Sequence, residues 1–272
     1  MTEILRPEAD ELRAVAHRMA DAARPEILKH FRSSTLHVDS KTDDFDPVTV
    51  ADRAAETAMR EILEAARPND AIVGEEFGNK EGSSGLTWIL DPIDGTRAFV
   101  AGTPCWGVLI ALADDTGPIV GIIDQPYIGE RFEGGFGHAA VTGPRGTTPL
   151  RVREPQPLHD AIVLTTFPEV GTPDEGAAFH RVASEAKLTR YGMDCYGYAL
   201  LAAGQVDLVI EAGLQIYDIA APIGVIQAAG GIVTNWEGGA DLTGGRVVAA
   251  ANQDILQQAL VRLSADGSKS AS

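Results

Sequence analysis

The chain has 272 residues, of which 44% are apolar and 22% charged, and it is expected to form one large globular domain or two smaller parts that share a core. Its 39 acidic and 22 basic residues give a net charge of −17, which repels nucleic-acid phosphates and argues against a nucleic-acid partner. No apolar run approaches the roughly 20 residues of a membrane span, and the first ten residues lack a signal-peptide pattern. We therefore expect a cytoplasmic protein without a membrane partner.

The first half of the chain predicts two amphipathic helices and several short, mostly antiparallel strands. Apolar residues follow a helical period over residues 8–31, where Pro25 is expected to kink or split the helix, and again over residues 49–66. A polar loop or irregular hairpin is expected over residues 33–47, and a mobile acidic loop over residues 79–85. The expected strands and hairpins cover residues 71–74, 88–90, 106–113, 118–124 and 134–149.

Near residue 150 the pattern changes to alternating strands and helices, which is typical of an α/β part following an α+β part. The expected strands cover residues 161–166, 189–191, 206–211 and 231–235, and the expected helices cover residues 174–187, 194–203, 216–229 and 253–263. Residues 265–272 are polar and are expected to be frayed.

Two carboxylates follow the apolar strand end at residues 88–90. Asp91 and Asp94 are separated by Pro-Ile and are followed by Gly95 and Thr96. We expect a turn just past the strand, with both carboxylates pointing off its tip. Gly95 and Thr96 can begin a helix whose free N–H groups donate hydrogen bonds to an anion. This combination suits a divalent cation together with a phosphate, although Asp-Pro and Asp-Gly are also ordinary turn residues.

Further acidic residues stand at the ends of other predicted elements. They are Asp46 and Asp52 around the start of the second helix, Glu75 and Glu76 after a strand, and Asp218 near the start of a helix. Each has a purely structural alternative, since acids favour the first turn of a helix and strand ends are often solvated.

Taken together, these segments resemble the inositol monophosphatase superfamily over about residues 8–264. The matching segments are Asp46-Pro-Val-Thr49-Val-Ala-Asp52, Gly74-Glu75-Glu76, Trp88-Ile-Leu-Asp91-Pro92-Ile93-Asp94-Gly95-Thr96, Tyr217-Asp218-Ile-Ala-Ala and Ala229-Gly230-Gly231. The resemblance implies a layered αβαβα sandwich of the inositol monophosphatase and fructose bisphosphatase type, commonly a homodimer. Residues 1–150 would form the metal- and phosphate-binding part, and residues 151–272 would complete the active site.

The resemblance also implies a site that holds two to three Mg²⁺ ions, with Mn²⁺ as a substitute. Glu75, Asp91 and the carbonyl of Ile93 would hold the first ion, and Asp91, Asp94 and Asp218 the second. A third, weaker ion would lie near Glu75. Carboxylates alone suffice for Mg²⁺, and the six histidines share no zinc-ligand spacing.

The catalytic residues implied by the resemblance are Asp52, Thr96 and Glu75. Asp52 and Thr96 would orient and deprotonate the attacking water, and the backbone N–H groups of Gly95 and Thr96 would bind the phosphate. The two cysteines, Cys105 and Cys195, are expected to be reduced and mostly buried.

Local segments are most similar to bacterial histidinol-phosphate phosphatases, a phosphoric monoester hydrolase subfamily. They are Asp94-Gly-Thr-Arg97-Ala98-Phe99-Val-Ala-Gly-Thr-Pro104-Cys-Trp106-Gly, Asp124-Gln-Pro-Tyr-Ile-Gly-Glu-Arg131-Phe and Tyr191-Gly-Met-Asp194-Cys-Tyr196. The implied substrate, L-histidinol phosphate, carries an ammonium and an imidazole, which Asp194 and Glu211 would bind.

Several alternatives to this assignment stay open. Asp194 is also a plausible helix cap, and an acid at Glu211 also serves inositol hydroxyls. The alternative substrates are inositol-1-phosphate or a broad set of polyol and sugar phosphates. A non-catalytic regulatory binding protein on the same fold is the alternative of another class.

Overall fold

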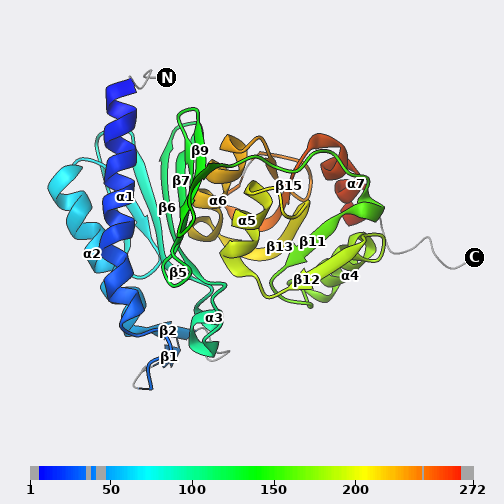
Figure 1. Cartoon of the computed structure of the whole chain (residues 1–272), viewed down its shortest axis with the longest axis horizontal. Coiled ribbons are helices and arrows are strands. Elements are labelled where there is room, and N and C mark those ends of the chain that lie inside the picture. Colours follow the sequence, from blue (N-terminus) through cyan, green and yellow to red (C-terminus); the bar gives the residue numbers. More distant parts are fainter. Residues whose placement is uncertain (1–5, 35–37, 41–46, 241, 265–272) are drawn as a thin grey trace, which may run out of the picture.

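The computed structural model describes residues 6–34, 38–40, 47–240 and 242–264, and Figure 1 shows two sheets alternating with three layers of helices. The predicted αβαβα sandwich is therefore confirmed. Helices α1 (Arg6–Leu28) and α2 (Val50–Ala66) cover the outer face of the larger sheet. Helices α5 (Asp194–Ala202) and α6 (Ile216–Ala228) lie between the two sheets. Helices α4 (Pro173–Ala183) and α7 (Gln253–Ser264) cover the outer face of the smaller sheet.

The larger sheet has eight strands in the order β10-β9-β8-β7-β6-β5-β3-β4, antiparallel except for the parallel pair β3 and β5. Its strands are β3 (Ala71–Gly74), β4 (Gly78–Lys80), β5 (Thr87–Asp94), β6 (Gly107–Asp114), β7 (Gly117–Gln125), β8 (Glu130–Gly135), β9 (His138–Gly143) and β10 (Gly146–Pro149). Helix α3 (Thr96–Ala101) follows β5, and the short strands β1 (Val38–Ser40) and β2 (Pro47–Thr49) pair with each other.

The smaller sheet has five strands in the order β12-β11-β13-β15-β14. Strand β11 is parallel to both of its neighbours, whereas β15 is antiparallel to both of its own. The strands are β11 (Ile162–Thr165), β12 (Leu188–Tyr191), β13 (Leu208–Gln215), β14 (Ile232–Asn235) and β15 (Gly244–Ala250), and a 3₁₀ turn, η1 (Leu158–Asp160), precedes them.

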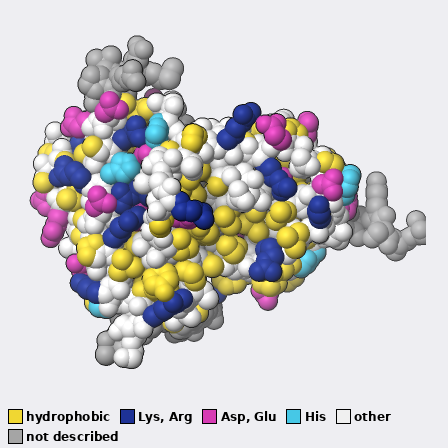
Figure 2. Space-filling view, in the orientation of Figure 1, with side chains coloured by type: hydrophobic (Ala, Val, Ile, Leu, Met, Phe, Trp, Pro, Cys, Tyr) yellow, Lys and Arg dark blue, Asp and Glu magenta, His cyan; other side chains and the backbone are white. Residues whose placement is uncertain are grey.

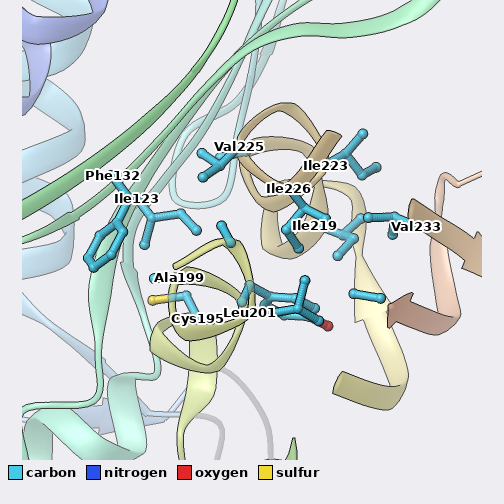
Figure 3. Packing of buried hydrophobic residues seen from close by; sticks show 14 of the residues in the cluster. Ile123, Phe132, Cys195, Ala199, Leu201, Ile219, Ile223, Val225, Ile226 and Val233 are labelled. Carbon is cyan, nitrogen blue, oxygen red and sulfur yellow. The ribbon is translucent and has the colours of Figure 1, made fainter. Parts of the chain in front are cut away.

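Helices cover both faces of each sheet, so successive side chains along a central strand pack on opposite faces in different clusters. In β6, Val108 and Ile110 pack in the cluster with α1 and α2, whereas Leu109 and Ala111 pack in the cluster with α5 and α6. Figure 3 shows the latter cluster, in which Ile123 and Phe132 of the larger sheet face the two central helices. The central layer therefore joins the two sheets through a continuous apolar core.

Helix α6 contacts the larger sheet backbone to backbone. A Cβ placed on Gly121 of β7 would lie 2.1 Å from the carbonyl oxygen of Ala221, and one on Gly134 of β8 would lie 2.6 Å from that of Gly224. Only glycine permits this approach. Because Asp218 lies near the start of α6, these glycines also fix the distance between Asp218 and the larger sheet.

Several sequence predictions need correction in the first half of the chain. The first helix is not split, because Pro25 lies only three residues before its end. The predicted loop at residues 79–85 begins inside β4, which pairs with β3 through its backbone. The strand predicted to end at residue 90 continues to Asp94. The expected hairpin at residues 33–47 is confirmed as the pair β1 and β2, with residues 41–46, and so Asp46, outside the described residues.

In the second half the predicted alternation is confirmed, except that strand β15 was missed. The predicted frayed tail, residues 265–272, lies outside the described residues. In the part of the chain that the structure describes, no helix combines the length and the apolar character needed to span a membrane.

An ionic network attaches α1 to strands β7 and β8. The buried carboxylate of Asp124 accepts hydrogen bonds from Arg24 and from Arg131. Glu133 accepts from Arg13, His17 and His138 at 3.2, 2.7 and 2.7 Å. Burial acts to raise the pKa of Glu133, but the hydrogen bonds and charges of these partners outweigh it and lower that pKa to about 2.

This network predicts acid destabilisation. The pKa of Glu133 is about 2 when folded against a reference of 4.5, so its contribution is present above pH 4.5 and lost as the pH falls toward 2. The free energy of unfolding of Glu133→Gln should therefore lie below that of the wild type at pH 7 and approach it below pH 4. Denaturant unfolding at several pH values measures the difference. Glu185→Gln, at an exposed ion pair with Arg262, is the control, and a pH-independent difference for Glu133→Gln would contradict the assignment.

Candidate active site

A cavity of about 270 Å³ opens where the end of β5, helix α3 and the central helices meet the smaller sheet. Its lining includes every predicted site residue except Asp52. Those residues are Glu75, Asp91, Ile93, Asp94, Gly95, Thr96, Asp194, Glu211 and Asp218. The fold thus brings together side chains from both halves of the chain.

A β-bulge directs Asp91 and Asp94 into the same cavity. Residues three apart in a regular strand point to opposite faces of the sheet. In β5, however, Asp91 pairs with Leu109 and Asp94 with Gly107, so β5 holds one residue more than β6 over this stretch. The bulge corrects the sequence expectation of a turn directly after residue 90, since the chain leaves the sheet only at Gly95.

Asp218 reaches the same position from the other half of the chain. It lies at the third position of α6, where its Oδ2 accepts a hydrogen bond from the backbone N–H of Gln215 at 2.6 Å. Asp94 Oδ2 in turn accepts from the backbone N–H of Cys195, at the start of α5, at 2.7 Å. Carboxylate oxygens of Asp91, Asp94 and Asp218 lie within 4.8 Å of one another.

The electrostatics of this cluster call for a counter-charge. Burial, followed by the charges of Glu75, Asp94 and Asp218, raises the pKa of Asp91 well above its ordinary value. Burial, followed by Asp218 and Asp194, does the same for Asp94. A donor set made only of oxygen atoms fits a hard divalent cation such as Mg²⁺. Glu75 and Ile93, which line the same cavity, could add a carboxylate and a carbonyl oxygen.

The turn from β5 into α3 is held by local hydrogen bonds. The N–H of Ile93 donates to Asp91 Oδ1 at 3.0 Å, and the hydroxyl of Thr96 donates to the Ile93 carbonyl at 3.1 Å. Gly95 precedes α3 with φ of 84°, which glycine adopts readily. A Cβ at Gly95 would also lie 2.9 Å from Asp194 Cβ. Glycine is therefore required here both for its conformation and for space.

Asp52 lies outside the cavity lining and is buried at the third position of α2. Its carboxylate accepts hydrogen bonds from the N–H and the hydroxyl of Thr49 at 2.8 and 2.6 Å. Burial outweighs these bonds and raises the pKa of Asp52 to about 7. Strand β2, which ends at Thr49, contacts α3, which begins at Thr96. The predicted pairing of Asp52 with Thr96 stays a prediction.

The two predicted substrate acids lie on the side of the smaller sheet, where Glu211 is buried and Asp194 is half-buried. Asp194 is the first residue of α5 and Met193 is its N-cap, with no side-chain cap, so the structure does not support the alternative of a capping role. Burial raises the pKa of Asp194 to about 6 against the charge of Arg97. Glu211 accepts hydrogen bonds from Thr165 and Thr166 at 2.7 to 3.2 Å, and burial raises its pKa to about 7.

Sequence reasoning missed part of the cavity wall. Thr166 and Phe167 follow β11, and the guanidinium of Arg97 lies 5.2 Å from the centre of the Phe167 ring. Phe167 is 44% exposed. Both residues lie just past the carboxyl end of a strand that has parallel neighbours. Because ligands bind at such strand ends, this position could have identified them as lining residues from the sequence.

Several known proteins with similar sequences and structures are named as phosphatases. The sequence profile of the inositol monophosphatase family matches residues 8–268. The chain is 42% identical to the "bifunctional phosphatase IMPL2, chloroplastic" of Arabidopsis thaliana, over 96% of this chain and 78% of that protein. It is 36% identical to a histidinol-phosphatase of Mycobacterium tuberculosis, over 91% and 95%. An inositol monophosphatase structure from Zymomonas mobilis matches with a TM-score of 0.82 at 36% identity, over 96% and 100%.

The buried charges predict that the metal-free protein loses stability as the pH rises. A carboxyl group with a raised pKa in the folded state favours folding at low pH, and this contribution is lost as the pH rises through the folded pKa. Asp94→Asn should therefore be more stable than the wild type in a chelator at pH 8. Saturating Mg²⁺, at about a hundred times its Kd, should stabilise the wild type by about 2.7 kcal/mol and the variant much less. Thermal unfolding with and without Mg²⁺ measures both effects.

The exposed turn residue Asp115 provides the control, since Asp115→Asn should respond to Mg²⁺ as the wild type does. Turnover of Asp94→Asn should fall by about a hundredfold or more if Asp94 is a metal ligand, as predicted. Near-normal turnover, or an unchanged response to Mg²⁺, would contradict the assignment of Asp94 as a ligand.

Proposed function

The chain belongs to the inositol monophosphatase family, and from this premise we propose that it is a Mg²⁺-dependent phosphatase that hydrolyses L-histidinol phosphate to L-histidinol and phosphate. The family supports the general activity, hydrolysis of a small phosphate monoester. The observation that carries the finer proposal is the pair of acids, Asp194 and Glu211, that line the cavity beside the three clustered carboxylates.

The proposed metal ligands are Asp91, Asp94 and Asp218, together with Glu75 and the carbonyl oxygen of Ile93. When bound, Mg²⁺ or its substitute Mn²⁺, as two to three ions, neutralises phosphate charge and lowers the pKa of water. The donor set supports this assignment, because carboxylate and carbonyl oxygens are the ligands that hard cations prefer.

The remaining catalytic roles belong to groups of the protein. The N–H groups of Gly95 and Thr96 would hold phosphate oxygens at the start of α3. The hydroxyl of Thr96 and the carboxylate of Asp52 would orient the attacking water and accept its proton, with Glu75 beside them. A carboxylate whose pKa is raised toward 7 is closer to the value that suits a general base at neutral pH.

The chemistry of the substrate matches the wall of the cavity. L-Histidinol phosphate carries an ammonium and an imidazole beyond its phosphate group. Asp194 offers a carboxylate next to Gly95, and Glu211 is held in place by Thr165 and Thr166.

The main alternative substrates are inositol-1-phosphate and a broader set of polyol and sugar phosphates. The chain is 36% identical both to the Zymomonas mobilis inositol monophosphatase and to the Mycobacterium tuberculosis histidinol-phosphatase, so these identities support this alternative and the proposal equally. Glu211 could accept hydrogen bonds from inositol hydroxyls as well as from an ammonium. A regulatory protein that binds Mg²⁺ without turnover is the alternative of another class.

We expect a cytoplasmic homodimer that binds neither nucleic acid nor membranes, with residues 1–150 and 151–272 as its two parts. Figure 2 shows hydrophobic side chains gathered over the middle of the viewed face, in the region of α5 and β12. Within β12, Leu188 and Tyr191 are 44% and 38% exposed. Apolar surfaces of this kind are typical of protein contacts, which supports the homodimer as a proposal.

The substrate assignment predicts how Asp194→Ala changes selectivity. Removing this carboxylate should lower kcat/KM for L-histidinol phosphate by about tenfold, or about 1.4 kcal/mol, and act mainly through KM, because a charged hydrogen bond to the substrate is lost. The value for a neutral polyol phosphate should change much less. Phosphate release with Mg²⁺ measures both.

The wild type separates the proposed function from its alternatives in the same assay. A preference for L-histidinol phosphate over inositol-1-phosphate supports the proposal, and a reversed or flat preference would replace it with the polyol phosphatase. The absence of turnover on every ester, with Mg²⁺ bound, would favour the regulatory protein. Equal effects of Asp194→Ala on both substrates would remove the role given to Asp194.

A further inference from the structure

Glu56 is a buried carboxylate that the proposed mechanism does not use. It lies in α2 one turn after Asp52, with no exposed surface, and it does not line the cavity. A buried charge of this kind is costly unless it is paired and hydrogen-bonded. The Nε of Arg60, one turn further along α2, donates to Glu56 Oε1 at 2.7 Å, so the charge is compensated from within the same helix.

The other partners of Glu56 lie in the turn after β3. Its Oε2 accepts a hydrogen bond from the backbone N–H of Glu76 at 2.7 Å, and its Oε1 accepts from the N–H of Phe77 at 3.3 Å. Arg60 donates to the carbonyl oxygen of Gly78 and lies 5.9 Å from the centre of the Phe77 ring. The two side chains therefore hold each of the three residues that follow Glu75.

The backbone of Glu75 is held from its other side by β5. Its N–H donates to the carbonyl oxygen of Leu90 at 3.2 Å, which continues the parallel pairing of β3 with β5 up to the residue before Asp91. Two hydrogen bonds thus fix the backbone around Glu75: its own N–H donates to Leu90, and the N–H of Glu76 donates to the Glu56 carboxylate. The position of its side chain relative to Asp91 depends on both.

Gly74, the residue before Glu75, leaves room for Glu56 and Arg60 to approach the backbone. A Cβ at Gly74 would lie 2.1 Å from Glu56 Oε1 and 2.5 Å from Arg60 Nη2. Gly74 has no positive φ that would require glycine, so the need here is for space. The absence of a side chain at Gly74 lets the Glu56 carboxylate and the Arg60 guanidinium pack against the backbone at the end of β3.

We infer that Glu56, with Arg60, is a positioning residue for the metal site that sets Glu75 at the distance from Asp91 required to share a cation. The inference rests on the proposed metal role of Glu75. Glu56 acts through the backbone of Glu76 and Phe77 rather than by touching the metal or the substrate. Its loss should therefore weaken cation binding by more than its effect on stability explains.

The test is Mg²⁺ binding to the metal-free full chain by isothermal titration calorimetry, with thermal unfolding of the same samples. Glu56→Ala should weaken Mg²⁺ binding by about tenfold or more, as loss of support around a ligand does elsewhere. The matched control is Leu63→Ala on the same helix, where a fully buried apolar side chain is shortened. It should lower the melting temperature and leave the Mg²⁺ affinity unchanged.

An unchanged Mg²⁺ affinity in Glu56→Ala, or equal weakening in both variants, would overturn the inference. If Glu56→Ala does not fold, Arg60→Met decides, with a weakening of about threefold expected and an unchanged affinity contradicting the role. Glu75→Gln separates this inference from the proposed function. If Glu75→Gln binds Mg²⁺ as the wild type does, or if the wild type binds none, the proposed role of Glu75 as a metal ligand is wrong. The inference about Glu56 then fails for that reason, whatever Glu56→Ala does.

Discussion

The repulsion among the carboxylates that meet where the two halves of the chain join, one of them buried and two half-buried, is the constraint on which the rest of the structure depends. Asp91 and Asp94 come from the larger sheet and Asp218 from the start of α6, and their oxygen atoms lie within 4.8 Å of one another. Burial and like charge raise the pKa values of Asp91 and Asp94. A bound cation would remove this conflict, so the residues that destabilise the metal-free chain are those that we propose hold the metal.

Several parts of the fold together fix the three carboxylates. The bulge in β5 turns Asp91 and Asp94 to the same side, and the backbone contact of α6 with β7 and β8 sets the position of Asp218. The N–H of Cys195 holds Asp94 from α5. The apolar core between the sheets makes these separate supports one rigid unit, because close-packed interiors resist deformation. A ligand geometry specified to within tenths of an ångström needs support of this kind.

Hydrophobic periodicity predicted most elements because it is a local signal, whereas the layers were predicted from the resemblance to the family. It missed β4, β15 and most of β8, since glycine and polar residues weaken the pattern and the pairing partners supply the order. The acidic residues of the cavity were predictable from the sequence, because the four acidic segments match the family's motifs in order and rough spacing. The contact of Gly95 with Asp194, and of Glu56 with the turn after Glu75, joins residues far apart in the chain. No local pattern encodes these contacts.

The most direct test of the account is the anomalous scattering of Mn²⁺ in crystals of the protein. A peak is expected among the carboxylates of Asp91, Asp94 and Asp218, with Glu75 within bonding distance of the same ion or its neighbour. The peak should disappear in Asp218→Asn crystals grown under the same conditions. A cavity without Mn²⁺ at millimolar concentration, or a peak that survives the loss of Asp218, would contradict the claim that the junction of the two halves is a metal site.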